Sequence, residues 1–486
     1  MANLPESDSK RPVVVLFRHD LRVADNRALS SAAETGKPVI PLFVLDEESN
    51  ATRPIGGARR WWLHYSLTRL SERLERLGCD LVLHKGPHNK SVAALVEESR
   101  ADVVLWNRRY DPPGNATDVE LASELTGRGV ISDCFDGHLL HEPSAVMTAT
   151  GHPYRVFTPF WRAVTAIDGP RDPVDPPKSL RRFERSLKTD RLEDWRLLPE
   201  TPDWAGGLRE AWMPGEEGAQ VNLEDFLAQS VKGYAERRDF PFLPGTSRLS
   251  PHLVHGEITP IQIVASLRAF KNAASTVDVD TFRKELGWRE FCWHLLVHNP
   301  QLSTQNFNRQ FDRFHWSGKA DLLKLWQQGR TGYPIVDAGM RQLWQAGWMH
   351  NRVRMITASF LVKHLLVDWR EGERWFWDTL VDADPANNPA NWQWVTGSGA
   401  DAAPYFRVFN PILQGEKFDP GGQYVRQFLP ELRSIPDDFV HKPWQATADI
   451  LLSAETGGGK KYPLPIVEHS KARVRALEAY KQLSGK

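Results

Sequence analysis

The first third of the chain alternates short apolar runs with segments in which apolar residues recur every three or four positions. Runs of four to eight apolar residues predict buried strands, and the wider spacing predicts helices with one apolar face. Five strands are expected, at residues 13–17, 39–45, 81–85, 103–106 and 130–135. Helices are expected between them at residues 26–34, 57–77 and 91–100. This alternation predicts an α/β domain with a parallel, doubly wound, Rossmann-like sheet.

The pattern changes twice along the rest of the chain. Residues 142–218 are rich in proline and charge, which is typical of a long surface connection. From about residue 222 onward helical spacing dominates, and no comparable strand pattern recurs. We therefore predict three regions: an α/β domain over residues 11–141, an interdomain linker over residues 142–218, and a large all-α domain over residues 219–486.

Composition and charge add a second contrast between the halves of the chain. Lys+Arg and Asp+Glu both total 61 in 486 residues, so a uniformly basic nucleic-acid binder is excluded. Residues 231–376, however, hold 20 basic against 13 acidic residues, a net +7, which leaves 41 against 48, or −7, elsewhere. This basic region suits phosphate binding, and unequal solvated faces are an equally open explanation. Twelve of the 19 tryptophans also lie after residue 280.

The spacing of the cysteines and the N-terminal sequence indicate in which cellular compartment the protein is expected. Cys79, Cys134 and Cys292 are too widely spaced for a disulfide framework or a CxxC metal site. Residues 1–12 are polar and lack the apolar core of a signal peptide. No apolar stretch approaches the roughly 18 residues that a membrane span needs. We expect a soluble, cytoplasmic protein that binds no metal.

A segment of backbone donors and hydroxyls lies at residues 245–251, which read Gly-Thr-Ser-Arg-Leu-Ser-Pro before a helix-like stretch. Backbone N–H groups, hydroxyls and a helix start can together hold a phosphate. An ordinary Ser/Thr helix cap is the alternative. The segment is thus a candidate phosphate site.

Two helical segments carry side chains suited to nucleic acids. Glu285, Trp288 and Arg289 fall at i, i+3 and i+4, so on a helix they share a face that could bind a planar, polar ligand such as a base. A buried ion pair beside a core tryptophan is the more ordinary explanation. In residues 348–355, Asn351 and Met355 share a face, whereas the two arginines of this segment are expected to point elsewhere. Asn can read base edges and Arg can contact phosphates.

An Asp- and Asn-rich segment over residues 382–394 lies between two predicted helices. Loops with many turn residues often carry ligand contacts. A calcium loop is excluded because no Glu stands at the required terminal position. The segment is therefore a candidate for binding an organic ligand.

Taken together, these segments resemble the photolyase/cryptochrome family over residues 13–479. The motifs that carry the resemblance are residues 17–22, 246–250, 288–291, 331–338, 349–355, 384–394 and 410–418. The resemblance implies an α/β antenna domain and a helical domain that buries FAD. It implies light-driven splitting of cyclobutane pyrimidine dimers in UV-damaged DNA by an electron from reduced FAD. A blue-light photoreceptor without repair activity is the alternative, and a nucleic-acid-binding protein without photochemistry is a third.

The resemblance also implies the residues that contact FAD. Tyr234 and residues 246–250 would hold the phosphates and ribose, and Asn388 would face flavin N5. The complete expected set is Tyr234, Thr246, Ser247, Arg248, Leu249, Ser250, Phe282, Glu285, Arg289, Asn351, Arg354, Asp382, Ala383, Asp384 and Asn388.

Contacts to damaged DNA and the electron route follow from the same resemblance. Glu285 would hydrogen-bond the dimer radical anion, and Trp288 and Trp394 would pack on the flipped-out dimer. The expected DNA-binding set is Arg238, Glu285, Trp288, Asn351, Arg352, Met355 and Trp394. The expected catalytic set is Glu285, Asn388 and the electron-relay tryptophans Trp392, Trp369 and Trp316.

Individual positions distinguish members of the family. Asn351 and Met355 stand where enzymes for (6-4) photoproducts usually carry His, which favours the dimer-repair branch. Residues 56–64 and 106–112 are most similar to class III photolyases. That subclass implies a 5,10-methenyltetrahydrofolate antenna, with a deazaflavin or no antenna left open. We expect a monomer without an obligate protein partner.

Overall fold

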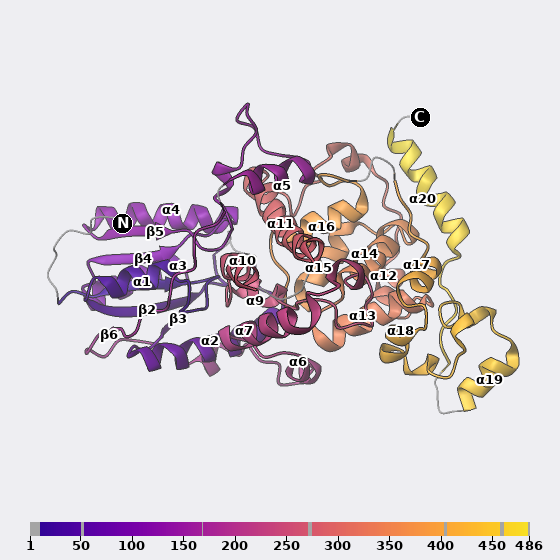
Figure 1. Cartoon of the computed structure of the whole chain (residues 1–486), viewed down its shortest axis with the longest axis horizontal. Helices are drawn as coiled ribbons and strands as arrows, with labels where there is room; N and C mark the ends of the chain where they lie inside the picture. Colours follow the sequence, from indigo (N-terminus) through magenta and orange to yellow (C-terminus); the bar gives the residue numbers. More distant parts are fainter. Residues whose placement is uncertain are drawn as a thin grey trace.

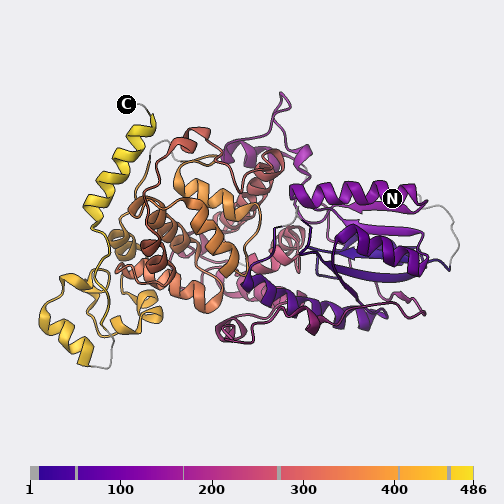
Figure 2. The same cartoon turned by 180° about the vertical axis from the view of Figure 1, so that it is seen from behind.

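The computed structural model describes residues 10–49, 53–167, 169–270, 275–402, 406–456 and 461–484. An α/β domain lies at one end of the molecule and a helical domain makes up the rest (Figures 1 and 2). The strands are β1 (Val13–Phe17), β2 (Pro38–Leu45), β3 (Val82–Lys85), β4 (Val103–Asn107), β5 (Ile131–Phe135) and β6 (Arg181–Arg182). Their order is β3-β2-β1-β4-β5, with β6 beside β2, and every pairing is parallel. The predicted parallel, doubly wound sheet is confirmed.

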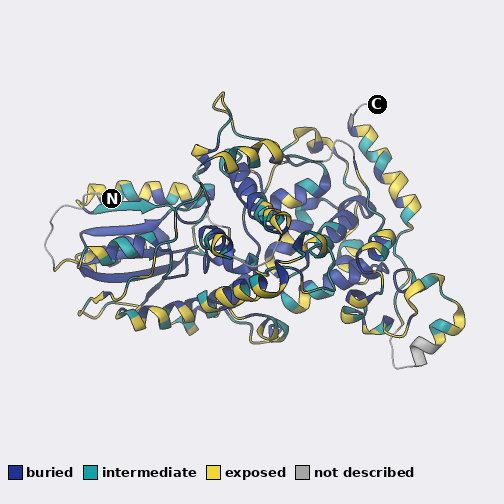
Figure 3. Ribbon diagram, in the orientation of Figure 1, coloured by how far each residue is buried: buried dark blue, intermediate teal, exposed yellow. Residues whose placement is uncertain are grey.

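Helices cover both faces of this sheet. They are α1 (Arg27–Glu34), α2 (Gly57–Leu77), α3 (His88–Ser99) and α4 (Pro112–Gly127). Alternate residues of β1 pack toward α1 and α2 on one face and toward the core with α3 and α4 on the other. All residues of β1 are therefore buried, as strands covered on both faces should be (Figure 3).

The hydrophobic pattern did not predict helix α4. Its first residues, Pro112 and Pro113, suggest a turn, but proline is tolerated in the first helical turn because those N–H groups need no helical partner. Asp111 caps the helix by accepting a hydrogen bond of 2.8 Å from the Gly114 N–H. Local capping thus forms a helix that periodicity does not reveal.

The proline-rich region contains more structure than a surface connection. It holds β6 and the helical elements η1 (Pro143–Ala145), α5 (Phe157–Ala166), η2 (Leu192–Trp195), α6 (Gly206–Ala211) and the start of α7 (Glu216–Asp225). Helix α5 packs on α11 (Thr276–His298), where the ring of Phe157 stacks 3.7 Å from that of Trp288. Gly287 permits this approach, since a Cβ there would lie 2.4 Å from the Trp161 ring. The region expected to be an interdomain linker therefore contains a packed helix, because apolar residues every three or four positions give α5 a buried face.

The remaining described residues form helices and loops, without a further strand among them. The elements are η3 (Phe226–Ser230), α8 (Tyr234–Arg237), α9 (Ser250–His255), α10 (Pro260–Ala269), α11, η4 (Arg309–Arg313), α12 (Ala320–Gln327), α13 (Pro334–Ala346), α14 (Asn351–Ser359), η5 (Phe360–His364), α15 (Trp369–Thr379), α16 (Asn387–Thr396), α17 (Pro411–Phe418), α18 (Gln423–Phe428), η6 (Pro430–Leu432), η7 (Asp437–Phe439), η8 (Pro443–Gln445), α19 (Ala448–Thr456) and α20 (His469–Ser484). Within the described ranges, no helix is long and apolar enough to cross a membrane.

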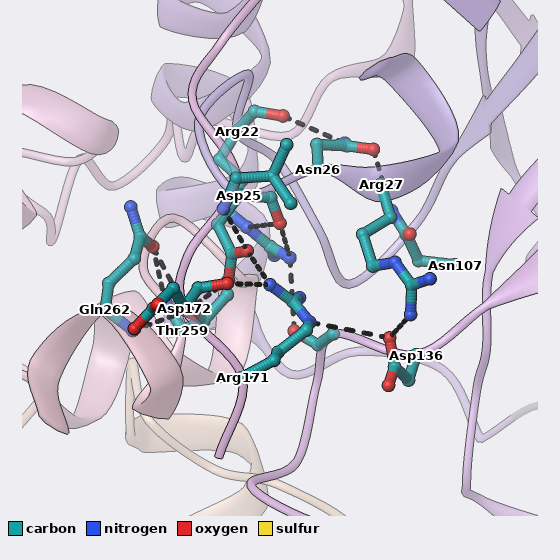
Figure 4. A network of polar contacts seen from close by, with 12 residues as sticks. Arg22, Asp25, Asn26, Arg27, Asn107, Asp136, Arg171, Asp172, Thr259 and Gln262 are labelled. Carbon is teal, nitrogen blue, oxygen red and sulfur yellow. Dashed lines mark hydrogen bonds and ion pairs between the residues drawn. The ribbon is translucent and has the colours of Figure 1, made fainter. Parts of the chain in front are cut away.

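A buried polar network joins the two domains through the connecting region (Figure 4). Asp25, which is fully buried, accepts hydrogen bonds from Arg171 Nη1 at 2.5 Å and from Thr259 Oγ1 at 2.7 Å. Thr259 caps α10 of the helical domain. The Arg22 guanidinium donates to the carbonyls of Asp25 and Gly256, both at 2.9 Å. The network thus links the two domains by an ion pair and by hydrogen bonds between buried groups.

Candidate functional site

A cavity of about 520 Å³ lies within the helical domain, between α9, α11, α14 and α16. All fifteen residues expected to contact FAD and all seven expected to contact DNA line it. The volume is in the usual range of cofactor sites. The structure thus gathers residues from five separate segments of sequence, and their individual roles stay predictions.

One wall of the cavity offers unpaired backbone donors. The N–H groups of Thr246, Ser247 and Arg248 make no hydrogen bond to any described residue. Arg248 adopts a positive φ of 52°, a conformation that lets successive N–H groups converge. Its guanidinium lies 4.1 Å from the ring of Trp212 and 5.7 Å from that of Trp348. Free N–H groups beside a cation suit a phosphate.

A buried ion pair forms the next part of the wall. Arg354 donates two hydrogen bonds to Asp382, from Nη1 at 3.0 Å and from Nη2 at 2.8 Å. Asp382 also accepts from Ser250 Oγ at 2.7 Å, which links this pair to the loop of free donors. Arg352 pairs with Asp239 and Arg354 with Asp382, and both arginines line the cavity together with Asn351.

Charged groups are also buried deeper in the cavity wall. Arg289 donates to Glu290 Oε1 at 2.9 Å and contacts His138 Nε2 at 3.0 Å. Burial raises the pKa of Glu290 to about 7, against the opposing effect of Arg289. Burial, with a smaller contribution from Arg289, holds the pKa of His138 well below its usual value. Burial likewise raises the pKa of Asp384. Such polar groups in an apolar enclosure are typical of functional sites.

Asn388 lines the cavity at the start of α16. Its Nδ2 donates to Glu373 on α15, at 2.8 Å to Oε1 and 3.1 Å to the backbone oxygen. Glu373, which does not line the cavity, therefore holds the side-chain amide of Asn388. Asn388 itself lines the cavity.

The residues expected to contact DNA line the same cavity. Glu285 forms an ion pair with Arg238, and both side chains are partly exposed. Trp288 is held by stacking on Phe157, and Trp394 Nε1 donates to the Asp401 oxygen at 3.1 Å. Two indole rings of fixed orientation thus lie beside a carboxyl group and a cation.

A second hollow of about 390 Å³ adjoins the cavity and shares Arg352, Met355 and Trp394 with it. Lys363, Arg407 and Lys417 also line this hollow. Arg352 Nη2 pairs with Asp239 Oδ2 at 2.7 Å, so the local positive charge is only partly neutralised. Burial lowers the pKa of Lys363 to about 7, so Arg407 and Lys417 are the groups here that suit a phosphate.

The three expected relay tryptophans differ in burial. Trp392 is 2 % exposed and lines the cavity, whereas Trp369 and Trp316 do not line it. Trp369 is fully buried and Trp316 is half-buried, with its ring 4.4 Å from Phe314. Gly372 lets Trp392 pack on α15, because a Cβ there would lie 2.1 Å from the indole ring.

Several cavity residues were missed by the sequence reasoning. Trp348 lies over the Arg354 guanidinium at 5.8 Å, and its Nε1 donates to Ser250 Oγ at 3.4 Å. Its position next to the 349–355 motif could have identified Trp348 as a site residue from the sequence. Ala358, Ala390 and Cys292 also line the cavity, but such small residues have no local pattern that distinguishes them from ordinary core.

Comparison with known proteins agrees with this geometry. Residues 13–178 match the family described as DNA photolyase, and residues 282–482 match the FAD binding domain of DNA photolyase. A deoxyribodipyrimidine photo-lyase of Agrobacterium fabrum is 55 % identical over 96 % of this chain and 97 % of its own length. Cryptochrome-1 of Arabidopsis thaliana is 36 % identical over 97 % of this chain and 70 % of its own length.

Solved structures give the same relationship. A bacterial class III photolyase from Agrobacterium tumefaciens superimposes with a TM-score of 0.95 and 53 % identity, covering 100 % of both chains. A Synechocystis cryptochrome has a TM-score of 0.86 and 26 % identity, covering 97 % of this chain and 100 % of its own. The first matched region contains strands β1 to β5, and the second contains the cavity helices α14 and α16 and most of α11. This chain therefore belongs to the DNA photolyase family.

Proposed function

We propose that this protein is a deoxyribodipyrimidine photo-lyase that uses light and FAD to split cyclobutane pyrimidine dimers in UV-damaged DNA. One observation carries the proposal: the same cavity joins a loop of free backbone donors to two fixed indole rings and a carboxyl group. The first part suits a dinucleotide cofactor, and the second suits two linked pyrimidines that have left the base stack.

The donor set of the cavity fits FAD. The free N–H groups at residues 246–248 would hold its phosphates, and the Arg354–Asp382 pair would contact the flavin and ribose. Arg289 and Asp384, both buried, would complete the polar contacts. When bound in its reduced form, FAD supplies upon excitation the electron that opens the dimer.

The dimer must leave the base stack to reach the cavity, and this has an energetic cost that stacking can offset. Trp288 and Trp394 provide flat apolar surfaces for the extruded pyrimidines. Arg238 and Arg352 would contact neighbouring phosphates, which fix the position of the DNA without reading its sequence. The partly exposed position of these cations at the cavity suits this role.

Glu285 would act on the dimer directly. When protonated, its carboxyl group can donate a hydrogen bond to the carbonyl oxygen on which negative charge develops. The ion pair with Arg238 fixes Glu285 at the cavity before DNA arrives. A DNA phosphate would then compete for the Arg238 guanidinium and release the carboxyl group toward the dimer.

Retention of the dimer pocket favours repair over a photoreceptor role. Trp288, Asn351, Met355 and Trp394 all line the cavity, although a receptor that binds no lesion has no need of them. We further propose 5,10-methenyltetrahydrofolate as the antenna, in line with the similarity to a class III photolyase. A near-UV band separate from the flavin bands in the absorption spectrum of the purified protein would support the folate. Flavin bands alone would contradict it.

The tryptophans Trp392, Trp369 and Trp316 would carry electrons from the surface to oxidised FAD. Trp392 lies at the cavity, so Trp392→Phe should remove most of the light-driven reduction of FAD. Chemically reduced Trp392→Phe protein should still repair dimers, because the relay is not part of that reaction. Photoreduction is followed by the loss of oxidised-flavin absorbance under blue light with an external electron donor.

The matched control for that substitution is Trp326→Phe. Trp326 belongs to the same core, with its ring 6.2 Å from Trp392, but it does not line the cavity. Its replacement should leave photoreduction close to normal. Unchanged photoreduction in Trp392→Phe would contradict the proposed relay.

The proposed function is tested first by the chromophore itself. Purified protein should carry close to one FAD per chain, released by denaturation and quantified by its absorbance. It should also bind dimer-containing DNA more tightly than the same undamaged sequence. Protein that folds but binds no added FAD would contradict the proposal.

A further inference from the structure

A chain of polar contacts leads from the α/β domain into the cavity of the helical domain. Its outer residue is Arg53, in the segment before α2, and its inner residue is Asn388 on α16. Glu373 on α15 lies between them. The Glu373 side chain is only 3 % exposed, against 35 % for Arg53. Arg53 does not line the cavity, and Glu373 links it by hydrogen bonds to Asn388, which does.

Arg53 and Glu373 form a two-pronged ion pair across the domain boundary. Arg53 Nη1 donates to Oε1 at 2.7 Å, and Nη2 donates to Oε2 at 2.9 Å. The guanidinium also lies 4.0 Å from the centre of the Trp377 ring, whose Nε1 donates to the Pro54 oxygen at 2.8 Å. This parallel geometry restricts both side chains. A buried carboxylate that lost its cation would be strongly destabilised.

Glu373 in turn fixes the orientation of Asn388. The Asn388 Nδ2 donates both to Glu373 Oε1 and to the Glu373 backbone oxygen. A side-chain amide has two N–H donors and one acceptor oxygen, and an ionised carboxylate and a carbonyl can only accept. The amide nitrogen must therefore face Glu373. The acceptor Oδ1 of Asn388 remains for the cavity.

We propose that Arg53 is a positioning residue for the flavin: it fixes Glu373, which orients Asn388 so that a hydrogen-bond acceptor faces N5. This inference rests on the proposed function, in which Asn388 lies at N5. Reduced FAD carries an N–H group at N5, and Asn388 Oδ1 can accept a hydrogen bond from it. Oxidised FAD has a lone pair at N5 instead. The α/β domain thus favours the reduced, repair-competent cofactor without touching it.

The test is the reduction potential of FAD in the holoprotein, measured in the dark by dithionite titration against a reference dye. Reduction adds two electrons and one proton to oxidised FAD and gives FADH⁻. In Arg53→Ala the side chains of Glu373 and Asn388 are no longer held in one orientation, which weakens the hydrogen bond to N5–H. The ratio of reduced to oxidised FAD at a given potential should then fall about tenfold. For a two-electron couple this is a shift of about 30 mV.

Three further variants separate orientation from general damage. Arg53→Lys keeps the cation but not the two-pronged geometry, so it should restore part of the shift. Glu373→Gln should match Arg53→Ala, and the double variant should be no worse than either, because both act on one contact chain. Arg128→Ala removes an exposed pair with Glu124 in the same domain and should cause no shift.

The result that overturns the inference is an FAD-loaded Arg53→Ala protein with an unchanged potential. If Arg53→Ala fails to retain FAD, unchanged potentials in both Arg53→Lys and Glu373→Gln overturn it equally. Failure of the unmodified protein to bind FAD is a different result, which contradicts the proposed function itself.

Discussion

Replacing Glu285 by Ala should slow dimer splitting about tenfold, the effect of losing about 1.4 kcal/mol of stabilisation of the developing anion. The repaired fraction per absorbed photon should fall less than the rate of splitting does, because this fraction depends on the competition between splitting and return of the electron. Binding of dimer-containing DNA should change little, since Trp288 and Trp394 still line the cavity. The measurement is repair yield at known light dose, beside equilibrium binding of the same oligonucleotide.

The matched variant for Glu285 is Glu285→Gln. A glutamine keeps an N–H donor at the same place, so it should retain more repair than alanine. It also removes the charge that pairs with Arg238, as alanine does. Equal loss of repair in both variants would assign the effect to the lost ion pair, and an unchanged yield in Glu285→Ala would contradict the role given to this carboxyl group.

Replacing Trp288 by Ala should weaken binding of dimer-containing DNA about 10- to 100-fold, since stacking contributes about 1–3 kcal/mol per base. Binding of undamaged DNA should change much less, because it depends mainly on phosphate contacts. The preference for damaged DNA should therefore shrink. Competition between damaged and undamaged oligonucleotides at fixed salt measures this directly.

Trp344→Ala is the control for that substitution. Trp344 is 56 % exposed and stacks on Trp375, and neither residue lines the cavity. Its loss removes an exposed indole of the same domain and should leave the preference for damaged DNA unchanged. If Trp288→Ala kept the full preference, the dimer would have to bind elsewhere.

Most of the candidate site could be predicted because its polar residues occur in short contiguous motifs. Residues 246–250 and 351–355 are each recognisable locally, and the structure brings both to one cavity. The sheet was predictable for a similar reason, since strands covered on both faces form continuous apolar runs.

The remaining features depend on contacts between distant parts of the chain. Arg53 and Glu373 are 320 residues apart, and nothing local to either residue indicates their pairing. Helix α5 supports Trp288 from a region whose prolines suggested a linker. Ala390 lines the cavity, but no local pattern in a single sequence distinguishes it from an ordinary core residue.

The central claim is tested most directly by counting dimers in DNA incubated with the fully reduced holoprotein. Matched samples are kept in blue light or in darkness, with a light-only sample lacking protein. The proposal predicts that dimers disappear only where protein and light are combined, and that intact pyrimidines replace them. Equal dimer counts in the lit and dark samples, with FAD bound and reduced in both, would contradict it.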